Sequence, residues 1–326
     1  MAADAALVAD VLGVGAAVVA LWVGALLFVR GAAGLAAAVG VPPLVVGLTV
    51  VGFGTSAPEL VTSVDAALVG RPDVAVGNVV GSNLFNFGIV LGGVLLLGAV
   101  PVAESLRRRD GPAVVIATVA LALVLADLRL TRPEGLALLA LFVGYLAVLL
   151  RGTLREAGAT AEARALDSAM PDASGRVGLL VRVVVGLGLI LFGADLLVRS
   201  AVDLARLAGL SEWVIGETVV AAGTSAPEIA ASLVAARRGL GDVAVGNLVG
   251  SNVFNGLVVL GAAGLVAPAT VTPAAIPTVV WLVGLTLVVA GFLWTGSRFA
   301  RAEGVVCLLA NGGRWVLDLL GRGVAG

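Results

Sequence analysis

Residues 45–92 read VVGLTVVGFGTSAPELVTSVDAALVGRPDVAVGNVVGSNLFNFGIVLG, and residues 214–261 read VIGETVVAAGTSAPEIAASLVAARRGLGDVAVGNLVGSNVFNGLVVLG. The two segments align without a gap at a constant offset of 169 residues, and 30 of their 48 positions are identical. The same offset pairs GALLFVR at residues 24–30 with GADLLVR at residues 193–199. Such an internal duplication indicates two structural repeats, so we expect the two halves of the chain to share one fold.

The composition is typical of a membrane protein. Of the 326 residues, 60% are hydrophobic and 13% are charged, whereas soluble domains are about 45–50% apolar and about 25% charged. Because a helix needs about 20 apolar residues to cross a bilayer, we predict an all-α, multi-pass protein of the cell membrane with about ten transmembrane helices. The predicted helices span residues 7–33, 42–69, 73–99, 112–127, 133–150, 178–207, 212–236, 242–267, 274–295 and 303–320.

The predicted helices divide into two groups of five. Residues 1–150 would form the first repeat, residues 178–326 the second, and the polar stretch 151–177 a cytoplasmic linker. Because five is odd, the second repeat would enter the bilayer from the opposite side, which gives an inverted repeat. With both termini outside, the cytoplasmic loops collect more arginine than the external loops, as expected for membrane proteins. The cytoplasmic set is Arg30, Arg107, Arg108, Arg109, Arg151, Arg155, Arg164, Arg176, Arg237, Arg238, Arg298 and Arg301.

Several classes of protein are disfavoured by the composition. A net charge of −1 offers no basic surface for nucleic acid. The chain has no histidine and one cysteine, Cys307, so it lacks the ligands that zinc and copper prefer. It also has no phosphate-binding GxxxxGK[ST] motif. We therefore expect neither a nucleotide nor a cofactor, and no enzymatic activity. The apolar run Leu7–Val29 is too long for the core of a signal peptide and is interpreted as a mature span.

The motif GTSAPE occurs at residues 54–59 and 223–228, each time within an apolar span. A carboxylate at that depth is costly and indicates a functional site. Pro58 and Pro227 should break or kink the helices at Gly54 and Gly223 and free the carbonyl groups of these glycines, which a cation could then bind. No arginine lies in mid-span nearby, which disfavours the alternative of a structural carboxylate in an ion pair.

Polar residues follow each glutamate at helical spacing. Thr55, Ser56 and Glu59 share one helical face, and Asn78, Ser82 and Asn86 are spaced by four residues. The second copy repeats the pattern, so the two copies together offer two carboxylates with hydroxyl, amide and backbone oxygens. Hard cations such as Ca²⁺ bind six to eight oxygens. Two carboxylates neutralise one divalent cation. Two monovalent cations in its place leave the site neutral, and three leave it at +1. The site could therefore hold alternative ion loads, which is what an antiporter needs. The candidate cation ligands are Glu59, Glu228, Gly54, Gly223, Thr55, Thr224, Ser56, Ser225, Ser82, Ser251, Asn86 and Asn255.

The paired GTSAPE and GSNxFN segments resemble the alpha repeats of the sodium/calcium exchanger family, within the cation/Ca²⁺ antiporter superfamily, and are most similar to the short prokaryotic members. The resemblance covers nearly the whole chain. It implies ten helices in inverted halves, Glu59 and Glu228 as main Ca²⁺ ligands, and the other candidates as ligands of Ca²⁺ and Na⁺. It also implies exchange of three Na⁺ for one Ca²⁺. Some relatives that need K⁺ carry Asp where Asn255 stands, and asparagine at both Asn86 and Asn255 argues against K⁺ co-transport.

Three other functions stay open: a proton/Ca²⁺ antiporter, a passive cation channel, and a membrane protein that binds cations without transporting them. For an antiporter we expect helices 1 and 6 to slide across a fixed core of helices 2, 3, 7 and 8.

Several single residues outside the ligand set also carry expectations. We expect Asn78 and Asn247 to hold the broken helices in place, and Asp73 and Asp242 to be N-caps. Glu217 is interpreted as a solvated helix start, with an ion entrance as the alternative.

Overall fold

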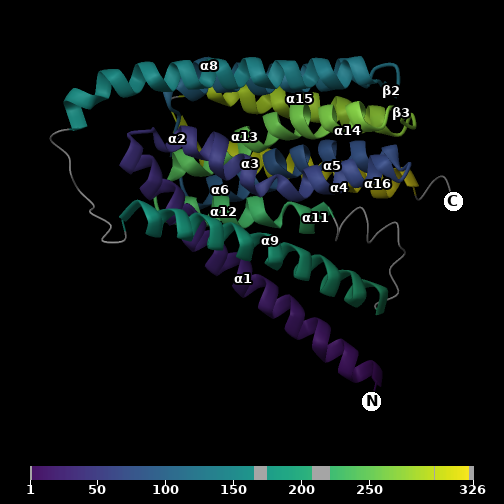
Figure 1. Cartoon of the computed structure of the whole chain (residues 1–326). Helices are drawn as coiled ribbons and strands as arrows, with labels where there is room; N and C mark the ends of the chain where they lie inside the picture. Colours follow the sequence, from purple (N-terminus) through teal and green to yellow (C-terminus); the bar gives the residue numbers. More distant parts are fainter. Residues whose placement is uncertain (1, 165–174, 208–220, 297, 323–326) are drawn as a thin grey trace.

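The computed structural model describes residues 2–164, 175–207, 221–296 and 298–322, and these residues are mostly helical (Figure 1). The first half contains α1 (Ala2–Val39), α2 (Pro43–Val46), η1 (Gly47–Val51), α3 (Gly52–Thr55), α4 (Ala57–Leu68), α5 (Pro72–Phe85), η2 (Asn86–Val90), α6 (Leu91–Leu97), β1 (Val100–Pro101), η3 (Leu106–Asp110), α7 (Gly111–Val124), β2 (Arg129–Leu130) and α8 (Arg132–Arg164). The second half contains α9 (Gly175–Leu207), α11 (Ala221–Thr224), α12 (Ala226–Arg237), α13 (Gly241–Phe254), η5 (Asn255–Val259), α14 (Leu260–Val266), β3 (Ala269–Thr270), α15 (Ala275–Thr295), β4 (Arg298–Phe299) and α16 (Arg301–Arg322). Elements labelled η are π-helical.

Six of these helices are long and apolar enough to cross a membrane. A seventh span is added if the pair Leu44–Thr55 and Ala57–Leu68, which is bent by 42°, counts as one broken helix. The described residues therefore contain six or seven candidate spans, fewer than the ten predicted. The short α7 and the charged α16 are among the predicted spans that do not qualify.

Two predicted helix boundaries differ notably from the structure. Helix α8 continues to Arg164, well past the predicted end at residue 150, so the first part of the predicted linker is helical. Helix α1 extends to Val39 rather than residue 33. Within the linker, residues 165–174 lie outside the described part of the chain, as do residues 208–220, which include the first part of the predicted helix 212–236.

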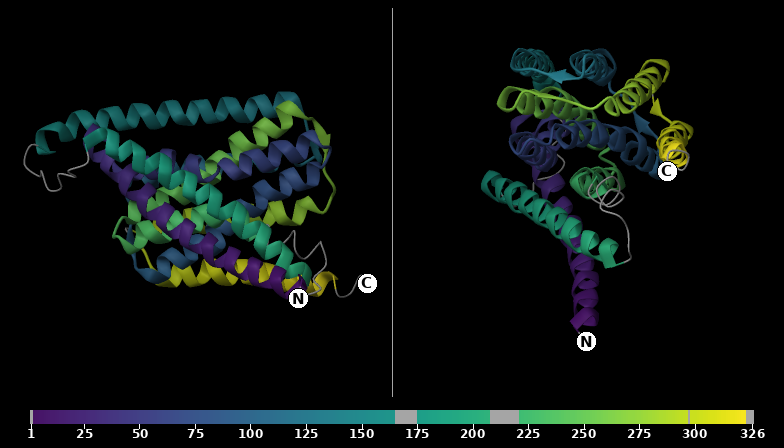
Figure 2. Two further views of the ribbon diagram at one scale, coloured as in Figure 1. Left: turned by 60° about the horizontal axis from the view of Figure 1, so that its bottom comes forward. Right: turned by 90° about the vertical axis from the view of Figure 1, so that its right-hand side faces the viewer.

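Helices α1 and α9 lie side by side along one face of the molecule, opposite α8 (Figures 1 and 2). Glycines permit a close antiparallel contact between them. A Cβ on Gly24 would lie 2.8 Å from the backbone nitrogen of Ile190, and one on Gly193 would lie 3.0 Å from that of Leu21. The two contacts are equivalent under the 169-residue offset, since Gly24 corresponds to Gly193 and Leu21 to Ile190.

Short antiparallel strand pairs join the two halves crosswise. In β1 and β4, Val100 pairs with Phe299, and in β2 and β3, Leu130 pairs with Ala269. The offset converts the first pair into the second. The 21-residue helix α15 separates β3 from β4, which at 1.5 Å per residue is about 31 Å. The two strand pairs therefore lie near opposite ends of the helix bundle.

The motif-bearing helices form the centre of the bundle. Helix α13 packs against η1, α3 and α12, and α4 packs against α5. Leu48, Val51, Val79, Leu248 and Val253 are fully buried there. This apolar packing surrounds the polar residues of the two motifs and fixes their positions.

Candidate cation site

Both copies of GTSAPE form an interrupted helix. Ser56 separates α3 from α4, and Ser225 separates α11 from α12, with ψ angles of 8° and 4° instead of helical values. The break lies two residues after the predicted position at Gly54, because proline is well tolerated in the first turn of a new helix. Glu59 and Glu228 consequently stand in the first turns of α4 and α12, where the positive end of the helix dipole favours a carboxylate.

Asparagines tether each half-helix to the next helix. Asn78 Nδ2 on α5 donates to Ser63 Oγ at 2.9 Å and to the Glu59 carbonyl at 3.2 Å. Asn247 Nδ2 on α13 donates to Ser232 Oγ at 2.8 Å and to the Glu228 carbonyl at 3.5 Å. The prediction that Asn78 and Asn247 hold the broken helices in place is confirmed.

Glu228 is fully buried and accepts hydrogen bonds from hydroxyl groups of both halves. Its Oε1 is 3.0 Å from Ser56 Oγ and 3.4 Å from Ser251 Oγ. Ser251 Oγ is also 3.0 Å from the carbonyl oxygen of Gly52, so its single proton is shared between the two acceptors. The second glutamate of the chain's duplicated motif is therefore held by Ser56 of the first motif, which joins the two predicted halves of the site.

Glu59 is also fully buried, but its environment differs from that of Glu228. It interacts electrostatically with Glu228 and with Ser82 of α5. No described residue forms a hydrogen bond of normal geometry with either of its carboxylate oxygens. Two fully buried carboxylates thus influence each other electrostatically in the apolar interior.

The oxygens that accept no hydrogen bond from described residues belong mainly to this site. They include both carboxylate oxygens of Glu59, Oε2 of Glu228, Oγ of Ser225, and Oδ1 of Asn86 and Asn255. Buried polar atoms in native proteins are nearly always paired, and bound cations pair with oxygens. Among the described residues no cluster of three or more His, Cys, Asp or Glu side chains occurs. A cation bound here would therefore meet two carboxylates and neutral oxygens, a set suited to Ca²⁺ and Na⁺.

Asn86 and Asn255 each begin a π-helical segment, η2 and η5. Asn86 Nδ2 donates to Asn252 Oδ1 at 3.0 Å. Such π-segments in α-helices are frequent at functional sites.

Asn83 and Asn252 are buried polar residues beside the candidate site that the sequence analysis missed. Each donates from its Nδ2 to the backbone carbonyl of the other, at 3.2 Å in both directions. They correspond to each other under the 169-residue offset and lie inside the repeated GSN sequence. That repetition was the available signal, but neither residue falls on the four-residue spacing of Asn78, Ser82 and Asn86 or of the equivalent residues in the second repeat.

The remaining candidates lie around this centre. Thr55 Oγ1 is 3.1 Å from Asn247 Oδ1, and Thr224 is buried. Gly54 and Gly223 face α1 and α9: a Cβ on Gly54 would lie 3.2 Å from the Phe28 ring, and one on Gly223 would overlap Val198. Glu217 lies outside the described residues.

The Asp73 and Asp242 predictions were wrong, because Arg71 and Leu240 are the N-caps and neither helix has a side-chain cap. Asp73 Oδ1 instead accepts hydrogen bonds from the backbone nitrogen and hydroxyl of Thr272, at 2.8 and 3.1 Å.

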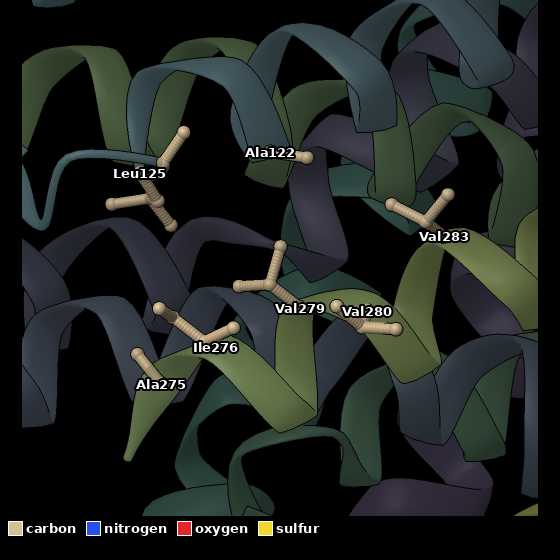
Figure 3. A pocket seen from close by; sticks show the side chains of 8 residues that line it. Ala122, Leu125, Ala275, Ile276, Val279, Val280 and Val283 are labelled. Carbon is tan, nitrogen blue, oxygen red and sulfur yellow. The ribbon is translucent and has the colours of Figure 1, made fainter. Parts of the chain in front are cut away.

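A separate cavity of about 330 Å³ lies between α7 and α15 (Figure 3). Its lining consists of aliphatic side chains such as Leu125, Ile276 and Val279. It offers no side-chain oxygen to a cation, so the candidate site is the motif region and not this cavity.

Comparison with known proteins identifies the family of the chain. The profile of the family described as sodium/calcium exchanger protein matches residues 10–151 and 178–311. The candidate antiporter CaxA of Alkalimonas amylolytica is 37% identical over 287 residues, which cover 87% of this chain and 90% of CaxA. The sodium/calcium exchanger MaX1 of Methanosarcina acetivorans is 29% identical over 331 residues, covering 86% and 90% of the two chains.

Solved structures show the same similarity. The sodium-calcium exchanger NCX_Mj, soaked with 2.5 mM Na⁺ and 0.1 mM Ca²⁺, has a TM-score of 0.79 and 30% identity, covering 92% of this chain and 96% of its own. The apolar helices, the buried oxygen-rich site and these relatives define an integral membrane protein that is a cation/Ca²⁺ antiporter. The chain belongs to the sodium/calcium exchanger family, a family of transporters and not of enzymes.

Proposed function

We propose that this protein exchanges Na⁺ for Ca²⁺ across the membrane by alternating access. The observation that carries the proposal is the pair of buried carboxylates, Glu59 and Glu228, which come from identical motifs and interact with each other. Two carboxylates balance the charge of one Ca²⁺. The neutral oxygens of Ser225, Asn86 and Asn255, unpaired among described residues, would serve Na⁺ when Ca²⁺ has left.

We also propose that the chain forms ten transmembrane helices in two inverted repeats, residues 1–150 and 178–326, joined by a linker at 151–177. The antiparallel contact of α1 with α9 supports this arrangement, since these helices are equivalent under the offset. The crosswise strand pairs and the reciprocal Asn83–Asn252 hydrogen bonds support it as well. Each relates the two halves by a two-fold operation, which an inverted repeat requires.

In this proposal Glu59 and Glu228 are the main Ca²⁺ ligands. The hydroxyl, amide and backbone oxygens of the other candidates complete the Ca²⁺ and Na⁺ sites. Gly54 and Gly223 face α1 and α9, so these two helices can cover the site from one side or the other as they slide across the core. Three Na⁺ per Ca²⁺ would move one net positive charge in each cycle.

The experiment is ⁴⁵Ca²⁺ uptake into proteoliposomes that are loaded with Na⁺ and diluted into Na⁺-free buffer. We expect uptake that needs internal Na⁺, is lost in Glu228→Gln, and is retained in Asp195→Asn. Asp195 is a suitable control because its carboxylate is exposed and paired with Arg199. A valinomycin-imposed K⁺ potential, positive inside, should accelerate the uptake if the ratio is three to one, since a net positive charge leaves the vesicle with each cycle.

Other outcomes separate the alternatives. Uptake that follows a pH gradient without Na⁺ would make the protein a proton/Ca²⁺ antiporter. Uptake that needs no counter-ion would make it a channel. Binding of ⁴⁵Ca²⁺ without any flux would leave a cation-binding membrane protein. A requirement for K⁺ would overturn the inference from Asn86 and Asn255.

A further inference from the structure

Helices α4 and α12 carry the same motif, but the structure covers them differently. Both α1 and α9 pack against α12, whereas among described residues neither packs to a comparable extent against α4. Asp65 on α4 is exposed, while its equivalent on α12, Val234, is 1% exposed. Val61 is 68% exposed, while its equivalent Ala230 is half-buried. The two repeats therefore differ in this structure: α12 is covered by α1 and α9, and α4 is not covered to a comparable extent.

The uncovered face of α4 contains a groove of about 330 Å³. Val61, Thr62, Asp65 and Ala66 line it along the helix. Of their equivalents on α12, Ala231, Val234 and Ala235 are buried and Ala230 is half-buried. The groove thus marks where a helix would pack if the two repeats exchanged their arrangements.

One side-chain contact crosses the covered interface and has no equivalent in the other repeat. The guanidinium of Arg237, at the end of α12, lies 5.1 Å from the ring centroid of Trp22 on α1. The offset converts Trp22 to Leu191 and Arg237 to Leu68. Two leucines cannot form a cation–π interaction, so this contact is available in only one of the two arrangements.

We propose that Trp22 and Arg237 form a one-sided latch that stabilises the access state in which α12 is covered and α4 is open. The inference rests on the proposed alternating access, because it needs α1 and α9 to move across the core. In the opposite state α9 covers α4, Leu191 approaches Leu68, and Trp22 separates from Arg237. The latch therefore makes the two access states unequal in free energy although the two ion motifs are identical.

The test replaces each latch residue with its equivalent from the other repeat, giving Trp22→Leu and Arg237→Leu. Two reporter variants, Asp65→Cys and Val234→Cys, are made in a Cys307→Ala background and labelled with a water-soluble thiol reagent in Na⁺- and Ca²⁺-free buffer. An exposed cation–π contact supports a change of about two- to fivefold in the equilibrium. We expect either latch variant to increase the labelling rate at position 234 by that factor and to slow labelling at position 65.

Three controls keep the result specific. Arg238→Leu removes the neighbouring exposed arginine and should leave both rates unchanged. Trp22→Phe with Arg237→Lys keeps a cation near an aromatic ring and should stay close to the parent, which shows that the helices still fold and pack. The double variant Trp22→Leu/Arg237→Leu should match either single variant, because one interaction is lost in all three.

Unchanged labelling in both latch variants, or an equal change in Arg238→Leu, would overturn the latch. The readout does not depend on transport. A shift in labelling without Na⁺-driven ⁴⁵Ca²⁺ uptake would keep the latch and reject the proposed exchange. Uptake without a shift in labelling would keep the exchange and reject the latch.

Discussion

Glu59 and Glu228 have the same sequence context but different hydrogen-bond partners. Glu228 accepts from Ser56 and Ser251, while no described residue donates to Glu59 with normal geometry. A buried polar group without a partner costs about 1–3 kcal/mol. In buffer without Na⁺ or Ca²⁺ we therefore expect Glu59→Gln to stabilise the folded protein by about this amount, measured as a rise in the thermal unfolding temperature in detergent.

The matched variant Glu228→Gln should be neutral or destabilising, because its carboxylate already accepts hydrogen bonds from two hydroxyl groups. Both variants should lose the stabilisation that Ca²⁺ gives to the parent, since bound ligand stabilises only a protein that can bind it. Destabilisation by Glu59→Gln in ion-free buffer would contradict this account of Glu59.

Asn247 is the more strongly bonded of the two tethering asparagines. It donates to Ser232 and the Glu228 carbonyl and accepts from Thr55, and it is fully buried. We expect Asn247→Ala to lower the free energy of unfolding by about 2–4 kcal/mol and to weaken Ca²⁺ binding. Asn78→Ala should cost less, because Asn78 is only half-buried. Chemical or thermal unfolding checks the order, and equal losses would contradict it.

At this scale the sequence predicted which residue types gather in the candidate site but not which atoms meet. The repetition of GTSAPE and GSNxFN indicated Glu59, Ser56 and Ser251 as neighbours in one site. Asn83 and Asn252 were missed because their contacts cross between repeats, which helical spacing does not show. Asp73 was misinterpreted for the same reason, since its partner Thr272 is 199 residues away.

At the scale of elements, close helix contacts depend on glycine. A Cβ on Gly250 of α13 would overlap the carbonyl oxygen of Leu48 in η1. We expect Gly250→Ala to push these elements apart and to destabilise the fold by about 1–3 kcal/mol or more. Gly284→Ala on α15, where a Cβ would meet nothing within 4 Å, should instead be neutral or stabilising, because alanine favours helix by about 0.5–1 kcal/mol. A lower unfolding temperature for Gly250→Ala together with an unchanged or higher one for Gly284→Ala would support this packing. Similar changes in the two variants would contradict it.

Most helix positions followed from apolar length and from the duplication, but their interruptions were less predictable. Proline indicated a break in each GTSAPE span. In the structure the first break lies at Ser56 instead of the predicted Gly54, because Pro58 fits the first turn of α4. The π-segments η2 and η5 have no signal in a single sequence, since they depend on how Asn86 and Asn255 pack between other helices. Helix α8 exceeds its predicted range because charged residues can continue a helix beyond the hydrocarbon core.

At the scale of the whole molecule, the arginine groups predicted from the sequence lie toward different ends of the bundle. Arg298 and Arg301 lie in or beside β4, which pairs with β1 near η3 and its arginines. Arg129 and Arg132 lie in or beside β2, which pairs with β3 about 31 Å away along α15. The beginning of α1 and the end of α16 lie toward the β2–β3 end (Figures 1 and 2).

This arrangement makes the predicted orientation testable with two exposed loop alanines. Ala126 follows α7 at the β2–β3 end, and Ala300 follows β4 at the other end. Because the arginine-rich β1–β4 end should face the cytoplasm, Ala126→Cys should react with a membrane-impermeant maleimide in intact cells. Ala300→Cys should react only after permeabilisation, with both variants made in a Cys307→Ala background. The reverse pattern would invert the orientation, and labelling of both from outside would contradict a bundle whose ends lie on opposite sides of the membrane.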